Sequence, residues 1–332
     1  MRVIQLDPDR DRATDLVRKL QFRPDGLMLA AVVGERDNVR ELCRYDLAQD
    51  KPLAEISSAV EDGLMSERLE NGADPVLCRD LELAAEVLAD YSGNLGIRLI
   101  DTWSQTLDEV WVRGPDEALH IVSLCFSTDT SILYIGNDSF ERTHIPNVSC
   151  FNVDDLFEGK DPSDAELETI HFDTQCRSTV LVTDPDDNWL AVGTDRRQLF
   201  LVDVARQKPT HTLQHPKGTG NSVQQLRFSP DSRSLLSLIG GNVALWDVRT
   251  ANLLRWHEPG TITDVAFSAD GKRIGMVQRD GDVVIHLTDT FAEVARYNWN
   301  VGPLHGIAFA PDGLTAAVGA TRGQVVIWDL DL

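Results

Sequence analysis

The sequence is poor in the residues that build disulfide frameworks, metal centres and membrane spans. Its 332 residues include only five cysteines, and no two of them form a CxxC pair. An odd, scattered set of cysteines is typical of free thiols in a reducing compartment. No run approaches the roughly 18 apolar residues that a membrane helix needs, and the N-terminus has no apolar signal-peptide core. We therefore expect a soluble, cytoplasmic protein.

Positive charge is also scarce, because 31 lysines and arginines stand against 53 aspartates and glutamates, for a net charge of −22. This excess repels nucleic acids and anionic membranes at long range and attracts basic surfaces. The acidity has two interpretations: it keeps the protein soluble, which is the simpler one, or it recruits a partner. We expect no binding to nucleic acid or membrane, and any protein partner to present a basic surface.

Sequence motifs for catalysis are absent: there is no HExxH, no GxSxG and no P-loop. Residues 7–11 have the 1-3-5 acidic spacing of a calcium loop, but Arg12 and Arg18 stand where a glycine and an acidic ligand are required. The eight histidines are scattered singly, among them His144, His171 and His305. The sequence predicts no catalytic residue, no cofactor and no metal site.

What the sequence has in abundance is internal repetition. One turn signal occurs three times near the C-terminal end, at 228–232 (Phe-Ser-Pro-Asp-Ser), 267–271 (Phe-Ser-Ala-Asp-Gly) and 309–313 (Phe-Ala-Pro-Asp-Gly). Each copy is followed by an apolar run, a second turn and a β-rich run. The β-rich runs are 243–247, 283–287 and 325–329.

Weaker copies of the same unit extend back to the N-terminus, at 22–26, 126–129 and 184–188, with one more between the first two whose first turn we expect to be shortened. The seven units close at positions 46, 101, 152, 203, 247, 287 and 329. The last three intervals are near the period of about 40 residues that characterises a four-stranded blade.

The residue types agree with such a blade. Pro-Asp-Gly favours a tight turn between strands, because proline presets φ and glycine tolerates positive φ. The flanking runs are apolar on both faces, as expected for a sheet covered on both sides.

The Phe-Ser-Pro-Asp-Gly turn, followed by a strand that ends in Trp-Asp, resembles the WD-repeat β-propeller family over nearly the whole chain. The resemblance implies an all-β fold in which residues 1–332 form one seven-bladed propeller of four-stranded antiparallel blades. The residues that carry the repeat are Trp246, Asp247, Trp328, Asp329, Asp231, Asp270 and Asp312.

One family feature is missing. Members often carry Gly-His before a repeat, and that histidine joins a Ser/Thr, an Asp and the Trp in a buried hydrogen-bond network. Here only His215 comes close, with Ser237 and Trp246 in suitable places but no Asp in the turn between. The blades are then expected to be held mainly by apolar packing.

The two ends of the chain complement each other. The last repeat stops after its third strand, whereas residues 2–6 (Arg-Val-Ile-Gln-Leu) have strand composition and precede the first repeat. We expect residues 2–6 to complete the seventh blade and close the ring. The alternative is that residues 1–15 form a disordered leader.

Function is expected on the insertions of the first four blades. By family topology, residues 58–75, 113–118 and 137–147 fall on one face, and residues 154–165 on the other. Residues 58–71 have capping-box spacing and read as an acidic helical lid or as a merely solvated loop. Leu156 and Phe157 either anchor the fourth insertion, which is simpler, or bind a partner. The candidate partner-binding residues are Glu61, Asp62, Glu67, Glu70, Arg113, Glu141 and Arg142.

Two functions from different classes remain open. The first is a non-catalytic protein-interaction scaffold that uses the loop-rich face. The alternative is a propeller enzyme of hydrolase or lactonase type with a metal in its central channel, whose ligands would come from several blades. Trp256 and Trp299 end comparable outer strands and are expected to pack rather than to form a ligand cage.

Overall fold

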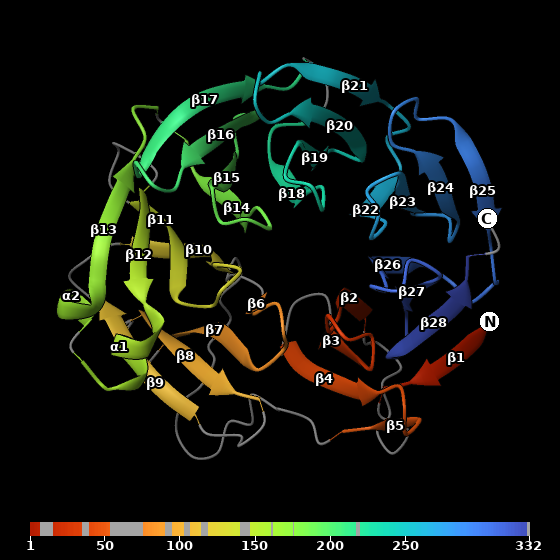
Figure 1. The fold of residues 1–332 in the computed structure, drawn as a ribbon, viewed down its shortest axis with the longest axis horizontal. Coiled ribbons are helices and arrows are strands. Elements are labelled where there is room, and N and C mark those ends of the chain that lie inside the picture. The colour runs from red at the N-terminus through yellow and green to blue at the C-terminus, as the bar shows by residue number, and fades with distance from the viewer. Residues whose placement is uncertain are drawn as a thin grey trace. The chain divides into compact units, whose positions relative to one another are not determined.

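The structure, a computed structural model, describes residues 1–6, 16–34, 40–53, 76–89, 95–102, 107–113, 119–139, 147–160, 162–174, 176–216 and 220–330. Within these residues almost all regular structure is antiparallel β-sheet (Figure 1). No helix in them is long and apolar enough to cross a membrane.

The strands form seven four-stranded sheets, which we call blades 1 to 7. Blade 1 comprises β2 (Leu16–Phe22), β3 (Met28–Gly34), β4 (Arg40–Asp46) and β5 (Lys51–Pro52). Blade 2 comprises β6 (Val76–Leu77), β7 (Leu83–Ala89), β8 (Leu95–Asp101) and β9 (Leu107–Arg113). Blade 3 comprises β10 (Leu119–Phe126), β11 (Ile132–Ser139), β12 (Asn147–Asn152) and β13 (Glu166–His171), with α1 (Val153–Phe157) and α2 (Pro162–Ala165) between its last two strands.

The remaining blades follow the same order. Blade 4 comprises β14 (Ser178–Thr183), β15 (Trp189–Thr194), β16 (Gln198–Asp203) and β17 (Lys208–Gln214). Blade 5 comprises β18 (Val223–Phe228), β19 (Ser234–Ile239), β20 (Asn242–Asp247) and β21 (Leu253–His257). Blade 6 comprises β22 (Ile262–Phe267), β23 (Arg273–Gln278), β24 (Val283–Leu287) and β25 (Glu293–Tyr297). Blade 7 comprises β26 (Leu304–Phe309), β27 (Thr315–Ala320), β28 (Gln324–Asp329) and β1 (Arg2–Gln5).

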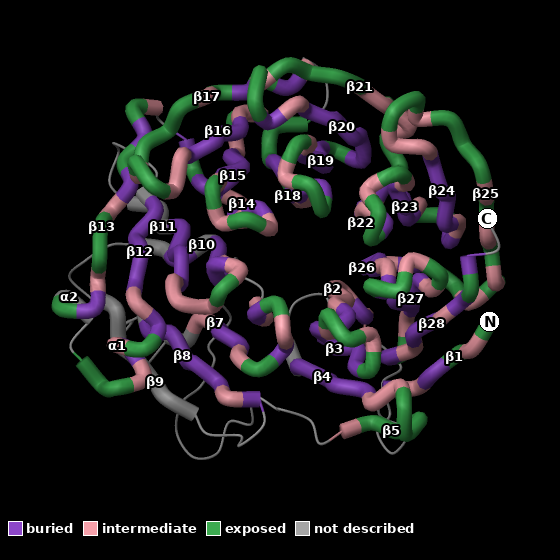
Figure 2. The backbone as a smooth tube through the Cα atoms, in the orientation of Figure 1, coloured by how far each residue is buried: buried purple, intermediate pink, exposed green. Residues whose placement is uncertain are grey.

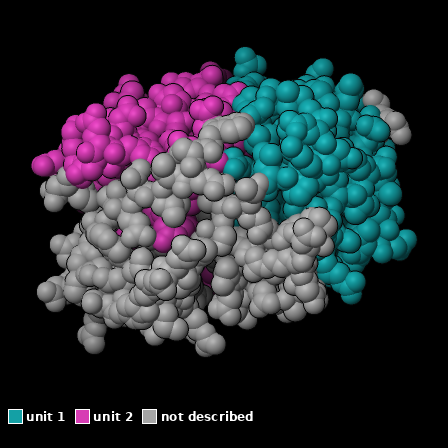
Figure 3. All heavy atoms as spheres, turned by 90° about the horizontal axis from the view of Figure 1, so that it is seen from below, with its two compact units in different colours: residues 1–58, 227–247, 253–332 teal, residues 59–226, 248–252 magenta. Residues whose placement is uncertain are grey.

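The chain is therefore an all-β, seven-bladed propeller, as the repeats predict. The third strand of every blade ends at the closing position read from the sequence. By contacts, the chain divides into two compact units (Figure 3). Unit 1 holds residues 1–58, 227–247 and 253–332, and unit 2 holds residues 59–226 and 248–252.

The turn between the first and second strands has one hydrogen-bond pattern in all seven blades. The residue that opens the turn donates its N–H to the carbonyl five residues later, at 2.8–2.9 Å. The fourth residue of the turn has φ between +53° and +73°. In six blades the third residue is an aspartate whose carboxylate accepts the N–H two residues later. These aspartates are Asp25, Asp80, Asp129, Asp231, Asp270 and Asp312.

The expectation of a shortened first turn in blade 2 is wrong. Residues 78–82 form a full turn, with Leu81 at φ +66° where other blades have glycine or a small polar residue. A left-handed backbone costs a leucine roughly 1–2 kcal/mol. Burial of the Leu81 side chain offsets this cost, and its carbonyl accepts a buried hydrogen bond from Thr102 Oγ1 at 2.5 Å. Because leucine occupies this position, comparison of the internal repeats did not identify the turn.

The middle strands bury both of their faces. Every residue of β3 is buried, and β20 is buried from Asn242 to Trp246 (Figure 2). The fourth strands are different: in β21 the first three residues are exposed. Because the sheet faces are covered, the described surface consists largely of turns, links and fourth strands.

Closure of blade 7 by the N-terminal strand is confirmed. β1 runs antiparallel to β28, with Arg2 opposite Ile327 and Gln5 opposite Gln324. Alternate side chains of β1 differ in burial, since Ile4 is buried in the core and Val3 is exposed. The N–H of Leu6 donates to the Gly323 carbonyl at 3.1 Å, and its side chain is buried, so the pairing continues to the end of the strand.

Ile4→Ala should lower the free energy of unfolding by about 2–5 kcal/mol, because it empties a packed core position. Val3→Ala, one residue away on the exposed face, should change it by less than about 0.5 kcal/mol. Deleting residues 1–6 should cost several kcal/mol, since β28 would become an open edge. Urea titrations of the three variants measure these changes. Equal midpoints for Ile4→Ala and Val3→Ala would show that β1 does not close the blade.

An aromatic cluster marks the core beside the end of β28. The Trp328 ring lies 4.8 Å from Trp299 and 5.7 Å from Tyr297, and all three belong to one core cluster. In blade 5, Trp246 donates its indole N–H to Ser237 Oγ at 2.8 Å. The position equivalent to Ser237 in blade 7 is Val318, so the Trp328 N–H has no partner among the described residues. Blade 7 therefore depends on packing where blade 5 also has this hydrogen bond.

Trp328→Ala should destabilise the protein by about 3–5 kcal/mol, as expected for a large aromatic removed from a core. Trp256 is only partly buried on the outer strand β21, so Trp256→Ala should cost much less. Thermal unfolding of both variants is the measurement. Matching melting temperatures would refute a dominant role for Trp328 in packing.

Candidate functional site

The acidic insertions expected to bind a partner fall largely outside the described residues. This applies to residues 54–75, which contain Glu61, Asp62, Glu67 and Glu70, and to residues 140–146, which contain Glu141 and Arg142. Arg113 is the last residue of β9, and its side chain is likewise not described. The third insertion is shorter than expected, because β11 continues to Ser139 and β12 begins at Asn147.

The topology of the insertions nevertheless follows from the described strands. Residues 54–75 connect the last strand of blade 1 to the first strand of blade 2, and residues 114–118 connect blade 2 to blade 3 in the same way. Residues 140–146 connect the second and third strands of blade 3. In an up-and-down sheet these two kinds of connection leave from the same end. The first turns and the turns before the fourth strand leave from the other end.

The fourth insertion is anchored by its apolar residues. Asn152 caps α1 by accepting the N–H of Asp155 at 2.9 Å, and Lys160 pairs with Asp155 in the turn that follows. Leu156 is buried and Phe157 is partly buried, and both pack against the core shared by blades 2 and 3. The simpler of the two interpretations of this pair, anchoring, is confirmed. Asp154, Glu158 and Asp164 of the insertion are exposed.

The histidines of the described residues do not form a metal site. No group of three or more His, Cys, Asp or Glu side chains there is arranged to hold an ion. His257 on β21 and His286 on β24 lie with ring centroids 5.4 Å apart, a pairing that sequence spacing did not reveal because the two belong to different blades. Burial lowers the pKa of both rings, and the edge of Phe291 faces His257 at 6.2 Å. The close packing of the two rings suits a structural role.

His215, the nearest sequence candidate for the family's histidine network, is also buried. Its Nδ1 lies 3.1 Å from the Arg197 carbonyl, and the N–H of the same residue donates to that carbonyl at 3.0 Å. A backbone carbonyl of blade 4 thus partners this ring nitrogen. Burial lowers the pKa of His215 to about 4.

This burial makes the stability of the fold depend on pH. The unfolded chain protonates His215 near pH 6.5 and the folded chain only near pH 4, so unfolding takes up a proton in this window. The free energy of unfolding should therefore fall as the pH drops from 6.5 to 4. Relative to His215→Gln, the native chain should lose on the order of 3 kcal/mol across this range. Urea titrations at several pH values measure this difference, and parallel curves for the two proteins would contradict it.

A buried carboxylate that sequence analysis overlooked joins three blades. Asp264 follows a bulge in β22 and is buried. Its Oδ1 accepts the N–H of Val265 at 2.7 Å, and its Oδ2 accepts the N–H of Ile307 in blade 7, also at 2.7 Å. Arg227 of blade 5 lies 3.9 Å from the same carboxylate. These partners satisfy the charge within the framework, so Asp264 is a structural residue. The sequence does contain a sign of this buried site, because Asp264 is a charged residue within the otherwise mainly apolar run Ile262–Phe267.

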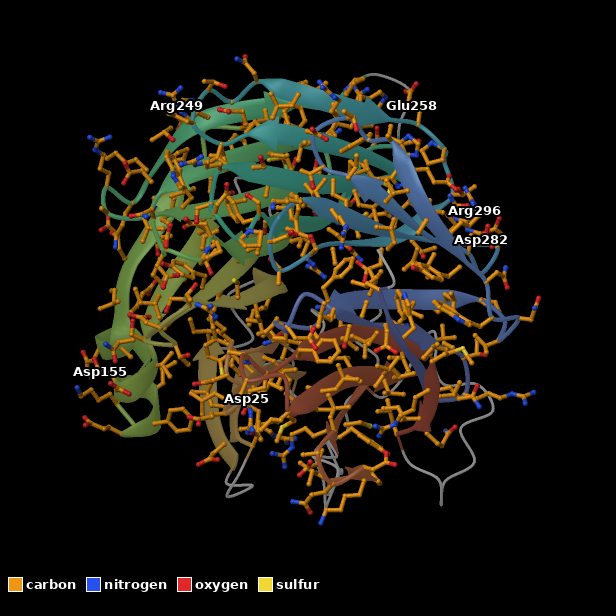
Figure 4. All side chains as sticks on the ribbon, turned by 45° about the vertical axis from the view of Figure 1, so that its right-hand side comes forward. Asp25, Asp155, Arg249, Glu258, Asp282 and Arg296 are labelled. Carbon is orange, nitrogen blue, oxygen red and sulfur yellow. The ribbon has the colours of Figure 1, made fainter. Side chains whose placement is uncertain are left out.

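Blades 5 to 7, which we call the lean blades, have only short connections, and an exposed ion network lies along the outer strand of blade 6. Arg296 donates to Asp282 and to Glu293, each at 2.7 Å, and Asn298 donates to Asp282 at 2.6 Å (Figure 4). These bonds lower the pKa of Asp282 and of Glu293. Because Asp282 holds Arg296 and Asn298 in place, replacing it would disturb local structure. Asp282 is therefore unsuitable as a control position in a test of partner binding by surface acids. Glu258 is exposed on the link between β21 and β22, and Asp280 is exposed on the turn between β23 and β24, where its carboxylate accepts one backbone N–H at 3.3 Å and forms no ion pair with Arg296. These two acids are better suited to a control variant.

Comparison with known proteins agrees with the fold. No family model matches the chain. It is 31% identical over 154 residues to an uncharacterized WD repeat-containing protein of Synechocystis sp., covering 42% of this chain and 41% of the relative. It is 22% identical over 271 residues to Protein NEDD1 of Homo sapiens, covering 70% of this chain and 40% of the relative. The matches thus span about two fifths of the length of these two relatives.

Two further comparisons point the same way. The chain is 31% identical over 97 residues to the APC/C activator protein CDC20 of Saccharomyces cerevisiae, covering 27% of this chain and 15% of the relative. Among solved structures, a chain of a mitotic checkpoint complex superposes with a TM-score of 0.71, 14% identity and coverage of 99% of this chain and 91% of that chain. That structural likeness shows the fold alone. Together with the seven repeated blades, the comparisons show that the chain is similar to proteins of the WD-repeat β-propeller family.

Proposed function

We propose that this chain is a non-catalytic, cytoplasmic protein-interaction scaffold whose residues 1–332 form one domain. Its partner presents a basic surface and docks on the loop-rich face of blades 1 to 3, at residues 58–75, 113–118 and 137–147. The contact residues are Glu61, Asp62, Glu67, Glu70, Arg113, Glu141 and Arg142. One of the boundaries between the two compact units, between residues 226 and 227, falls inside the strand β18, which favours one domain.

The observation that carries the proposal is the distribution of burial. The middle strands of the described blades are largely covered on both faces, and buried charged groups such as Arg98, Glu86 and Asp264 are paired within the framework: Arg98 donates to Glu86 at 3.0 Å, and Asp264 on β22 accepts two backbone N–H groups. Variable chemistry is therefore left to loops, and the longest insertions are acidic. A chain with a net charge of −22 attracts basic partners and steers their approach.

The relatives support the same class of function. Two relatives, the APC/C activator protein of Saccharomyces cerevisiae and a serine-threonine kinase receptor-associated protein of Dictyostelium discoideum, are named for their association with other proteins. The superposed structure belongs to a multiprotein complex. Propellers of this family usually contribute a surface and perform no chemistry of their own.

Replacing Glu61, Asp62, Glu67 and Glu70 with lysine should weaken capture of the partner without lowering the melting temperature, because the proposal places these charges at the protein surface, where charges contribute little to stability. Association should also slow as salt rises, since such charges are screened beyond roughly 8–10 Å at physiological ionic strength. Affinity capture from the native organism supplies the partner, and surface plasmon resonance measures its association rate with the native and variant chains.

The matched control is Glu258→Lys with Asp280→Lys, which alters exposed acids on the lean blades. This variant should retain the partner. If it loses the partner while the quadruple variant keeps it, the partner docks on the lean blades and not on the insertions, and the acidic insertion serves only solubility.

A further inference from the structure

The first turns of blades 1 and 7 lie side by side within unit 1. A Cβ atom built on Gly26 of blade 1 would lie 4.0 Å from Cδ of Pro311 in blade 7. Beneath the turns, Phe22 packs in one core cluster with Ala308 and Ala310. The two turns therefore present one continuous surface on a shared base.

These two turns differ from the other five at one position, the residue directly after the positive-φ residue. Five blades have a polar residue there: Glu82, Ser131, Asn188, Arg233 and Lys272. Blades 1 and 7 have Leu27 and Leu314, whose exposed fractions are 51% and 67%. Since the turn forms equally well with polar residues, folding does not explain two exposed leucines in adjacent turns.

The prolines of the two turns extend this apolar surface. Pro24 and Pro311 are both exposed. We call the four residues Pro24, Leu27, Pro311 and Leu314 the leucine-pair surface. Its leucines contribute backbone bonds to the fold, because the carbonyls of Leu27 and Leu314 accept the N–H groups of Leu47 and Leu330. Their side chains remain in solvent, where exposed apolar groups in a cluster are typical of an interaction site.

The charges around the surface are mainly negative. Asp25 and Asp312 are exposed in the turns themselves, and Asp329 is exposed at the end of β28 (Figure 4 labels Asp25). Arg23 pairs with Asp25 at 2.6 Å and is the basic group of the blade 1 turn. The residue equivalent to Leu27 and Leu314 is Arg233 in blade 5 and Lys272 in blade 6, and each provides a positive charge beside the aspartate of its own turn. Blades 1 and 7 have leucine there. Asp25 is paired with Arg23 inside its own turn, whereas Asp312 and Asp329 can attract an outside cation.

We propose that the leucine-pair surface docks a short segment of a partner protein that carries leucine-like side chains next to lysine or arginine. This inference goes beyond the proposed scaffold function, because the first turns leave the blades from the end opposite to the links that carry residues 58–75. Four exposed side chains make a contact far below the size of a stable interface, so binding is weak and transient.

The test uses the full chain with isotope-labelled leucine methyl groups, observed by NMR. The probe is an eight-residue capped peptide of alternating lysine and leucine. Matched probes replace either the lysines with glutamate or the leucines with serine. The lysine–leucine peptide should shift the methyl signals of Leu27 and Leu314 with a dissociation constant below about 1 mM. Each matched peptide should bind at least about tenfold more weakly, because it lacks one half of the recognised chemistry.

The variant Leu27→Ser with Leu314→Ser should keep its melting temperature and lose at least about tenfold in affinity for the lysine–leucine peptide, which corresponds to about 1.4 kcal/mol. The matched control is Leu253→Ser, an exposed leucine on β21, which should bind as the native chain does. The lysine variant of residues 61, 62, 67 and 70 should also keep this affinity, so failure of the scaffold proposal and failure of this one are separable.

Several outcomes would overturn the inference. One is equal binding of all three peptides, and another is unchanged affinity in the double serine variant. A third is a set of methyl shifts that avoids Leu27 and Leu314, and a fourth is no shift up to about 1 mM peptide. A dimer that forms in sedimentation experiments and is abolished by the two serines would mean that a second copy of this chain is the occupant.

Discussion

Each blade of this chain buries both faces of its sheet, and blade 7 gains its fourth strand only from the other end of the chain. The pairing of β1 with β28 therefore joins residues 2–5 to residues 324–327. It places Ile4 and Leu6 in the same core cluster as Val325 and Val17. This antiparallel pairing joins the two ends of the chain in one blade, beside the core packing of Phe22 in blade 1 with Ala308 and Ala310 in blade 7.

The covered sheet faces also decide where function can lie. Buried polar groups such as Asp264 and His215 are partnered inside the framework, which leaves the turns and links to vary. At the first turns, the aspartate carboxylates and the positive-φ residue are fixed by the backbone, whereas the following residue is free to change. A propeller can thus acquire a docking surface by changing one residue in each of two adjacent turns, without a change in its fold.

The repeats made most of the fold predictable. The closing positions and the β-rich runs 283–287 and 325–329 follow from strong local patterns, and the strands end there. The full turn at residues 78–82 was not predicted, because Leu81 occupies a left-handed backbone position that sequence rules assign to glycine. The pair of His257 and His286 and the bonds of Asp264 escaped for another reason: they join different blades, and spacing within one repeat carries no information about them. The acidic partner-binding residues lie on insertions without a repeating pattern, so their placement on one face remains a prediction.

Native-state hydrogen exchange of the intact chain tests the central claim, that the two ends of the sequence form one cooperative blade. The hydrogen-bonded amides of β1 should exchange only through global unfolding, with the same free energy as those of β28 and of the fully paired strand β27. Exchange of the β1 amides at the rate of an unstructured peptide, while β27 remains protected, would contradict the account.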